Sequence, residues 1–165
     1  MKKLFILFVF IHSYSFSQDD TSFDVCNQPV LDFARAERGE IKNPEVVFLQ
    51  CSDFNLMRGN QAINISNYIG AIEFFTKAID YKNNFEEAYY GRGQAKYLLK
   101  DYYGAITDFT NVIDLNPNLF NAYFYRGFSK GMLEDANGAC KDILRAKELG
   151  KEDQNINNII GIVCK

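Results

Sequence analysis

The stretch that decides the fold is residues 86–119, EEAYYGRGQAKYLLKDYYGAITDFTNVIDLNPNL. Its Arg-Gly pair recurs along the chain in steps of 34 residues, at 58–59, 92–93 and 126–127. A Gly-Ala pair keeps the same spacing, at 70–71, 104–105 and 138–139. A period of this length is typical of a solenoid of stacked helix pairs, an architecture that usually binds other molecules.

Within this stretch the hydrophobic pattern predicts two helices. Apolar and small residues recur at steps of three and four from Ala88 to Tyr97, and again from Ala105 to Ile113. Asp101 stands where the N-cap of the second helix belongs, and Asn116-Pro117 ends that helix because proline cannot continue it. The result is an antiparallel hairpin, in which Gly93 lets the two backbones approach closely.

The arginine of each Arg-Gly pair has two interpretations. A row formed by Arg58, Arg92 and Arg126 would attract an acidic ligand. The interpretation that we favour is structural, because the position faces the second helix of the hairpin. It predicts that Arg92 pairs with Asp108 and Arg126 with Asp142.

The three units resemble tetratricopeptide repeats. That family's pattern is an aromatic residue, a glycine, an alanine, a large apolar residue and a proline, and the middle unit matches it with Tyr89, Gly93, Ala105, Phe109 and Pro117. The third unit matches with Tyr123, Gly127, Ala139 and Ile143 and lacks the proline. The first matches with Gly59, Ala71 and Phe75, but has Asn55 at the aromatic place and Asn83 at the proline place. Terminal repeats are often atypical in this way.

This resemblance implies an all-α fold, an α-solenoid of three helix hairpins. We expect an N-terminal extension at 18–51 and a C-terminal capping helix at 151–165, whose apolar face is Ile156, Ile159, Ile160 and Val163. The repeats themselves are expected at 52–85, 86–119 and 120–150. In the extension, Asn43-Pro44 is typical of a helix start that leads onto the first repeat.

The first 17 residues are typical of an export signal. Lys2 and Lys3 precede an apolar run at 4–11 that is short for a membrane span, and small residues favour cleavage before Gln18. An uncleaved membrane anchor is the alternative. Cleavage predicts a mature chain of 148 residues, exported and either periplasmic or secreted, with 16 basic and 21 acidic residues and a net charge of −5.

The composition of the mature chain excludes several classes of function. Its net negative charge and the absence of a basic stripe argue against nucleic acid as a partner and against stable membrane insertion after signal cleavage. The only histidine, His12, leaves with the signal, so the usual general base and the commonest metal ligand are missing. We therefore expect no enzyme activity, no cofactor and no metal. Glu86 and Glu87 are adjacent on a helix and point apart, so they are interpreted as acids favoured at a helix start.

The four cysteines, an even number in an exported chain, indicate disulfides. Three pairings are possible, and free buried thiols are the alternative. We favour Cys26–Cys51 and Cys140–Cys164, because each bond would tie a terminal segment to the nearest repeat. Cys140 also occupies a place that should pack on the following helix, which would carry Cys164.

The resemblance also implies where a partner would bind. First helices line the concave side in this family, so the expected groove residues are Asn60, Tyr90, Gln94, Tyr97, Asn121, Phe124 and Phe128. Aromatic rings would form its floor and amides its rim. One subgroup clamps a partner's C-terminal carboxylate with cationic and amide side chains, but here only Asn60 matches. Leu56, Gly91, Asn121 and Tyr125 occupy the other places, which predicts that the clamp is absent.

The sequence thus predicts a non-catalytic, exported interaction module, or scaffold, that holds a protein or peptide partner in its concave groove. The alternative is a structural subunit of an envelope assembly that uses its convex face or its ends.

Overall fold

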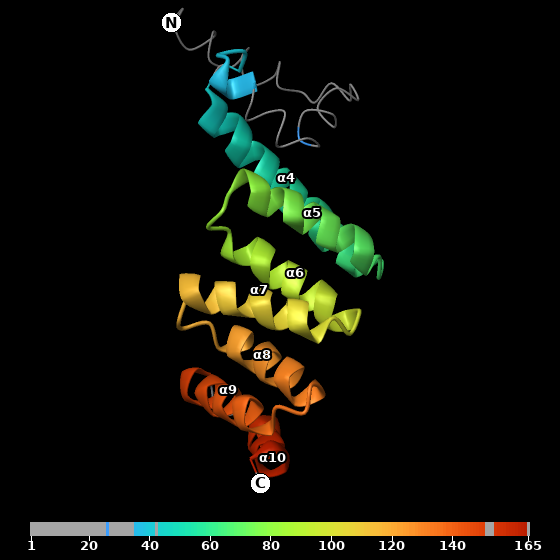
Figure 1. Ribbon diagram of the computed structural model, residues 1–165, viewed down its shortest axis with the longest axis vertical. Helices are drawn as coiled ribbons and strands as arrows, with labels where there is room; N and C mark the ends of the chain where they lie inside the picture. Colours follow the sequence, from blue (N-terminus) through green and yellow to red (C-terminus); the bar gives the residue numbers. More distant parts are fainter. Residues whose placement is uncertain (1–25, 27–34, 42, 151–153, 165) are drawn as a thin grey trace, which may run out of the picture.

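The computed structural model describes residues 26, 35–41, 43–150 and 154–164. Within these residues the chain is helical and contains no strand, as the sequence predicts. The expected signal at 1–17 lies outside them. Figure 1 shows the helices stacked in chain order along the molecule. They are α4 (Pro44–Asn64), α5 (Tyr68–Tyr81), α6 (Glu86–Leu98), α7 (Tyr102–Leu115), α8 (Phe120–Met132), α9 (Ala136–Leu149) and α10 (Gln154–Val163).

Each repeat is a helix hairpin, formed by α4 with α5, α6 with α7 and α8 with α9. The second helix of each hairpin has an N-cap residue whose side chain accepts a hydrogen bond from the backbone N–H three residues later. This bond gives a partner to one of the N–H groups that have none at the start of a helix. The caps are Asn67, Asp101 and Asp135, at 3.1, 2.9 and 2.9 Å. The cap at Asp101 is predicted above, and the 34-residue period places Asn67 and Asp135 at the equivalent positions.

The first helix begins earlier than the first repeat is expected to begin. Helix α4 starts at Pro44, directly after Asn43, whose backbone is left-handed with φ 55°. Proline suits this first helical position because the N–H that it lacks would have no partner within the helix. The helix therefore continues from the N-terminal extension into the first repeat without a break at Ser52.

Small residues bring neighbouring helices into close contact. A Cβ added to Gly59 would lie 2.5 Å from the ring of Phe75, and one added to Gly91 would also collide with that ring. One added to Gly93 would lie 3.0 Å from Phe109, which confirms the close approach predicted there. Both phenylalanines are fully buried.

A buried ion cluster joins the two helices of the middle repeat. Asp108 is fully buried and accepts bonds from Arg92 Nη2 at 2.7 Å and from Lys96 Nζ at 2.8 Å. Arg92 Nη1 donates to Thr76 Oγ1 of the preceding repeat at 3.1 Å. The predicted pair is confirmed, and the guanidinium also connects consecutive repeats.

The third repeat has the same cluster, with Arg126, Lys130 and Thr110 around Asp142. The first repeat differs, because the place of the aspartate is taken by Phe74. There the guanidinium of Arg58 lies 5.0 Å from the centre of the Phe74 ring. The arginines therefore have structural roles, as we expect from the sequence.

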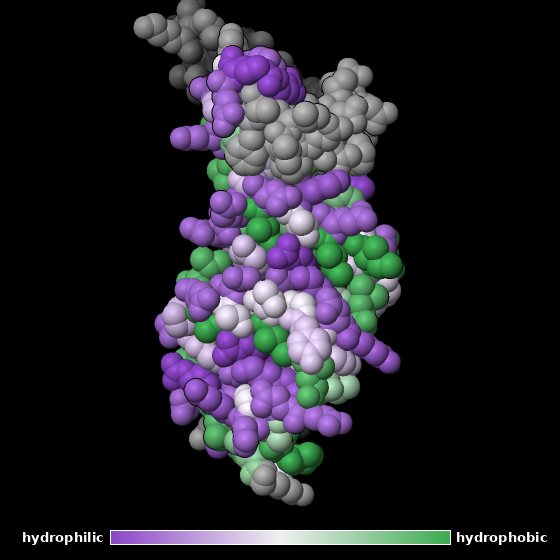
Figure 2. Space-filling view, in the orientation of Figure 1, coloured by the Kyte–Doolittle hydropathy of each residue, from purple (hydrophilic) through white to green (hydrophobic). Residues whose placement is uncertain are grey.

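Exposed hydrophobic residues gather at the turns within the hairpins. The exposed fractions at these turns reach 74% for Tyr103, 71% for Ile65 and 66% for Ile69, and outside them Ile162 in α10 is 71% exposed. Figure 2 shows hydrophobic side chains along the side of the molecule where these turns lie, on the right in the view of Figure 1. No described helix combines the length and the hydrophobicity needed to cross a membrane.

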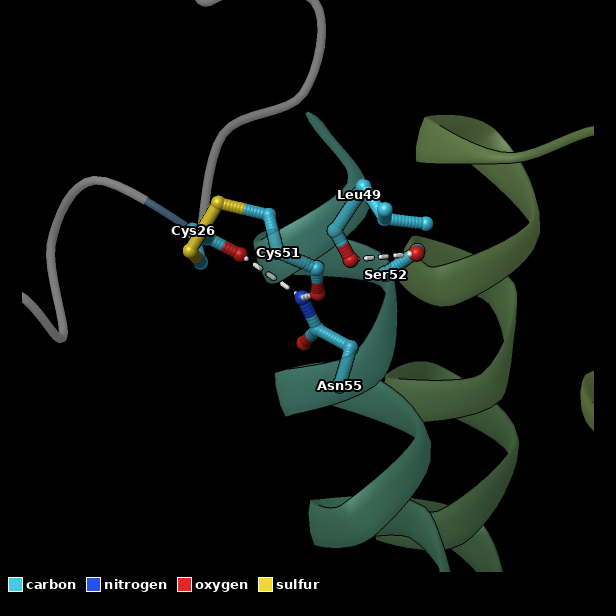
Figure 3. Close-up of a disulfide and its surroundings, with 5 residues drawn as sticks. All are labelled: Cys26, Leu49, Cys51, Ser52 and Asn55. Atoms are coloured by element: carbon cyan, nitrogen blue, oxygen red, sulfur yellow. Dashed lines mark hydrogen bonds between the residues drawn. A yellow bond between two sulfur atoms is a disulfide. The ribbon is translucent and has the colours of Figure 1, made fainter. Parts of the chain in front are cut away.

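The structure has the two disulfides that the sequence analysis favours. Cys26 is joined to Cys51 in α4, and Asn55 Nδ2 donates to the backbone oxygens of both cysteines, at 3.0 and 2.9 Å (Figure 3). Asn55 is 1% exposed and stands at the aromatic place of the repeat pattern. The first repeat therefore departs from the pattern at a position that binds Cys26.

The second disulfide, Cys140–Cys164, ties the end of the chain to α9. Helix α10 covers the last repeat, as predicted, because Ile156 is 4% exposed and packs in one cluster with Ile143 and Ala146.

Candidate partner-binding groove

The first helices of the three repeats line an open hollow of about 340 Å³. Four of the seven predicted groove residues line it. They come from all three repeats and are Asn60, Tyr90, Gln94 and Asn121. The remaining lining residues are Leu56 from α4, Glu86, Glu87 and Gly91 from α6, and Leu119 before α8. The 34-residue period explains this convergence, because it places equivalent positions of successive first helices side by side.

Tyr90 is held in one orientation by its neighbours. Its ring packs edge to face against Phe109 and Tyr125, with centroids 5.8 and 6.1 Å away. Gln94 Nε2 donates to the Tyr90 hydroxyl at 3.3 Å. Burial, and to a lesser degree the neighbouring Tyr125, raises the pKa of Tyr90 to about 12. The hydroxyl therefore stays protonated at neutral pH and can both donate and accept hydrogen bonds.

The charge of the hollow is negative. Both Glu86 and Glu87 line it, which differs from the expectation that they point apart, and no lysine or arginine is among the described lining residues. Glu86 accepts a hydrogen bond from Asn116 Nδ2 at 3.2 Å, which orients it, whereas Glu87 is exposed. The cations of α6 lie elsewhere, since Arg92 and Lys96 are both bound to Asp108.

The other three predicted groove residues lie outside this hollow. Tyr97 packs edge to face against Tyr102 and Tyr125. Phe124 and Phe128 are 4.7 Å apart between ring centroids, and both pack on the C-terminal cluster around Ile143. Phe128 also lines a smaller apolar hollow of about 200 Å³ that it shares with α10. The single aromatic floor expected from the sequence is therefore divided, with Tyr90 in one part and the two phenylalanines in the other.

Tyr125 connects these parts, and the sequence analysis did not include it among the groove residues. Its ring stacks on Phe109 at 5.6 Å and contacts Tyr90, Tyr97 and Phe124. The equivalent positions are Met57 in the first repeat and Gly91 in the middle repeat, so the period does not fix the size of the residue there. The available signal is that an aromatic residue stands at this place in the third repeat.

The structure shows where the residues at the positions of a carboxylate clamp lie. Leu56, Gly91 and Asn121 line the hollow beside Asn60, and Tyr125 lies in the adjoining aromatic cluster. These side chains carry no positive charge, so this part of the groove lacks the cations that such a clamp needs.

Comparison with known proteins agrees with the helix-hairpin fold. The family model for the tetratricopeptide repeat matches residues 86–119. No curated protein matches the chain in sequence.

Solved structures match most of the chain. The first TPR of Spaghetti (RPAP3), bound to the HSP90 peptide SRMEEVD, is 25% identical with a TM-score of 0.67, over 70% of this chain and 92% of that one. The Arabidopsis OM64 TPR domain is 22% identical with a TM-score of 0.68, over 70% and 96%. The TPR2B domain of yeast Sti1, in a pHsp70 complex, is 18% identical with a TM-score of 0.64, over 68% and 95%. Residues 86–119 therefore match the model of a tetratricopeptide repeat, and the helical stack around them has the fold of TPR domains.

Proposed function

We propose that this chain is a non-catalytic, exported interaction module that binds an extended segment of a partner protein in the groove of its first helices. The observation that carries the proposal is the hollow of about 340 Å³ to which all three repeats contribute. Tyr90 offers a rigid ring in it, and Asn60, Gln94 and Asn121 offer amides that can bond a peptide backbone.

Similar structures support a role in peptide binding. The Spaghetti domain is bound to an HSP90 peptide, and the second TPR domain of human RPAP3, 21% identical over 69% of this chain and 98% of that one with a TM-score of 0.63, is in complex with an HSP70 peptide. Those peptides are SRMEEVD and SGPTIEEVD, both rich in acidic residues. No lysine or arginine is among the described residues that line the hollow of this chain, so we expect its partner to differ in charge from these peptides.

Export is the second part of the proposal. Two disulfides within one small chain favour an oxidising compartment, because thiols in the cytosol are kept reduced. We expect a mature N-terminus at Gln18 in a periplasmic or secreted fraction. Cell fractionation followed by N-terminal sequencing tests it, and an intact Met1 in a cytosolic fraction would contradict it.

Site-directed photocrosslinking tests the groove. A photoreactive residue at Asn60, exposed on α4, should crosslink the partner in native extracts. The same residue at Lys147, exposed on α9, is the matched control and should not. Replacing Tyr90 and Gln94 by alanine should abolish the Asn60 crosslink while the circular dichroism spectrum stays helical. Crosslinks from Lys147 alone would contradict the groove.

A second candidate function is that of a structural subunit of an envelope assembly. The exposed apolar residues of the hairpin turns favour it, because contiguous apolar surface often marks a protein interface. This surface is an edge of the stack rather than its convex face or ends. Polar substitutions at Ile65 and Tyr103 would then release the chain from its assembly and leave the Asn60 crosslink unchanged.

A further inference from the structure

The hollow carries a negative charge that nothing in its lining compensates. Glu87 is exposed and makes no ion pair within the part of the chain that the structure describes, and Glu86 is bonded only by the neutral amide of Asn116, at 3.2 Å. The nearest cations along α6 are Arg92 and Lys96, which are held by Asp108 at 2.7 and 2.8 Å. They are therefore not available to neutralise the groove.

Helix stability alone does not account for these acids. Carboxylates in a first turn interact favourably with the helix dipole, which is one reason for Glu86 and Glu87. The equivalent first turn of α8, however, begins with Phe120 and Asn121 and contains no acidic residue. The third repeat folds without acids at this place, so they are not a requirement of the repeat.

The rest of the lining suits a long cationic side chain. Leu56 and Leu119 provide apolar surface for a methylene stem, and the carboxylates lie on the same hollow. The Tyr90 ring adds an aromatic surface on which an ammonium or guanidinium group can rest. The amides of Asn60 and Gln94 can bond the backbone on either side of that side chain.

Resting on the proposed groove function, we propose that the partner segment is basic: a lysine or, preferably, arginine side chain flanked by apolar residues enters the hollow and pairs with Glu87 and Glu86. Arginine is preferred because its planar fork can bond two carboxylate oxygens at once. The selectivity is thus opposite in sign to that of a carboxylate clamp.

Three matched peptides test this proposal on the full mature chain with its disulfides intact. Each has the sequence Gly-Leu-X-Leu-X-Leu-Gly, with an acetylated N-terminus and an amidated C-terminus, and X is arginine, glutamine or glutamate. Binding is measured by fluorescence anisotropy and by the NMR shifts of the Tyr90 ring. We expect the arginine peptide to bind about fivefold to tenfold more tightly than the glutamine peptide, and the glutamate peptide most weakly. Added salt should reduce the difference because both carboxylates reach solvent.

Two double variants of equal net charge sharpen the test. Glu86→Gln with Glu87→Gln should remove the preference for arginine over glutamine. Glu73→Gln with Glu134→Gln, at two exposed glutamates outside the hollow, should keep it. A preference that survives in the first double variant would overturn the proposal.

The outcomes separate this proposal from the groove function. If all three peptides shift the Tyr90 resonances with equal affinity, the groove binds peptides and the basic preference is wrong. Tighter binding of the glutamate peptide would overturn the preference in the same way. If no peptide shifts Tyr90 at millimolar concentration and Asn60 crosslinks no partner, both the preference and the groove function fail.

Discussion

Helix α6 presents two polar faces that differ in one respect, which is whether their charges are paired within the chain. On one face Arg92 and Lys96 are bound to the fully buried Asp108. On the other face Glu87 lies in the hollow without an ion pair among the described residues, beside Tyr90. A buried charge destabilises the fold when its partner is removed, whereas a charge left unpaired in a hollow is available to a ligand. The two faces should therefore respond differently to substitution.

Breaking the paired face should have the largest effect. We expect Asp108→Ala to lower the free energy of unfolding by about 3–5 kcal/mol, because it leaves two largely buried cations without their partner. Glu87→Gln on the open face should change it by about 0.5 kcal/mol or less, as for an ordinary surface position. Denaturant unfolding measures both, and comparable losses in the two variants would erase the distinction between the faces.

The first repeat supplies a control for this prediction. There Phe74 and Ala62 take the places of Asp108 and Lys96, and Arg58 lies over the Phe74 ring. The double variant Asp108→Phe with Lys96→Ala copies that arrangement into the middle repeat. It should recover most of the stability, to within about 1 kcal/mol of the parent, since apolar replacement of a buried ion cluster is often nearly neutral.

A medium effect is expected at Gly91, which lines the hollow on the open face of α6. Alanine there gains about 1 kcal/mol in helix propensity but must displace the fully buried Phe75, so we expect a net loss of about 1–2 kcal/mol. Gly131→Ala is the matched control, because the nearest atom to its added Cβ is 3.7 Å away. It should stabilise the chain by about 0.5–1 kcal/mol. The same sign for both substitutions in thermal unfolding would show that propensity outweighs the contact with Phe75.

The sequence predicts the architecture well because the same helix-hairpin pattern occurs three times along the chain. The caps at Asn67, Asp101 and Asp135 and the pairs of Arg92 and Arg126 all follow from residues within one repeat, where helix geometry fixes which side chains meet. Repetition then makes each local inference an independent check on the others.

The parts that it predicts poorly are those where one repeat differs from the next. Asn55 at an aromatic place looks like a weak repeat, but it binds Cys26, which lies 29 residues earlier and outside the period. Tyr125 fills a place that is methionine in the first repeat and glycine in the middle one, and its ring contacts Phe124, which packs with Phe128 on the C-terminal cluster. The repeat pattern describes what the repeats share and not how they differ. The contacts that shape the groove of this chain are therefore seen only in the structure.

The smallest expected effect is a pH dependence that belongs to the paired face. Burial raises the pKa of Asp142, but bonds and charges from Arg126 and Lys130 outweigh it and hold that pKa below its ordinary value of 3.8. Because the folded pKa is the lower one, the carboxylate contributes stability above pH 3.8 that is lost as the pH falls through the folded value.

Asp142→Asn should therefore flatten the acid side of the stability profile. We expect the parent to lose about 1 kcal/mol more than the variant between pH 6 and pH 2.5, comparable to the net contribution of one buried hydrogen bond. Urea unfolding across this range measures the difference in the free energy of unfolding. Glu87→Gln is the control, and its stability should fall with pH as steeply as that of the parent. Parallel profiles for Asp142→Asn and the parent would mean that the buried cluster adds no acid sensitivity, and the contrast between the two faces would then rest on geometry alone.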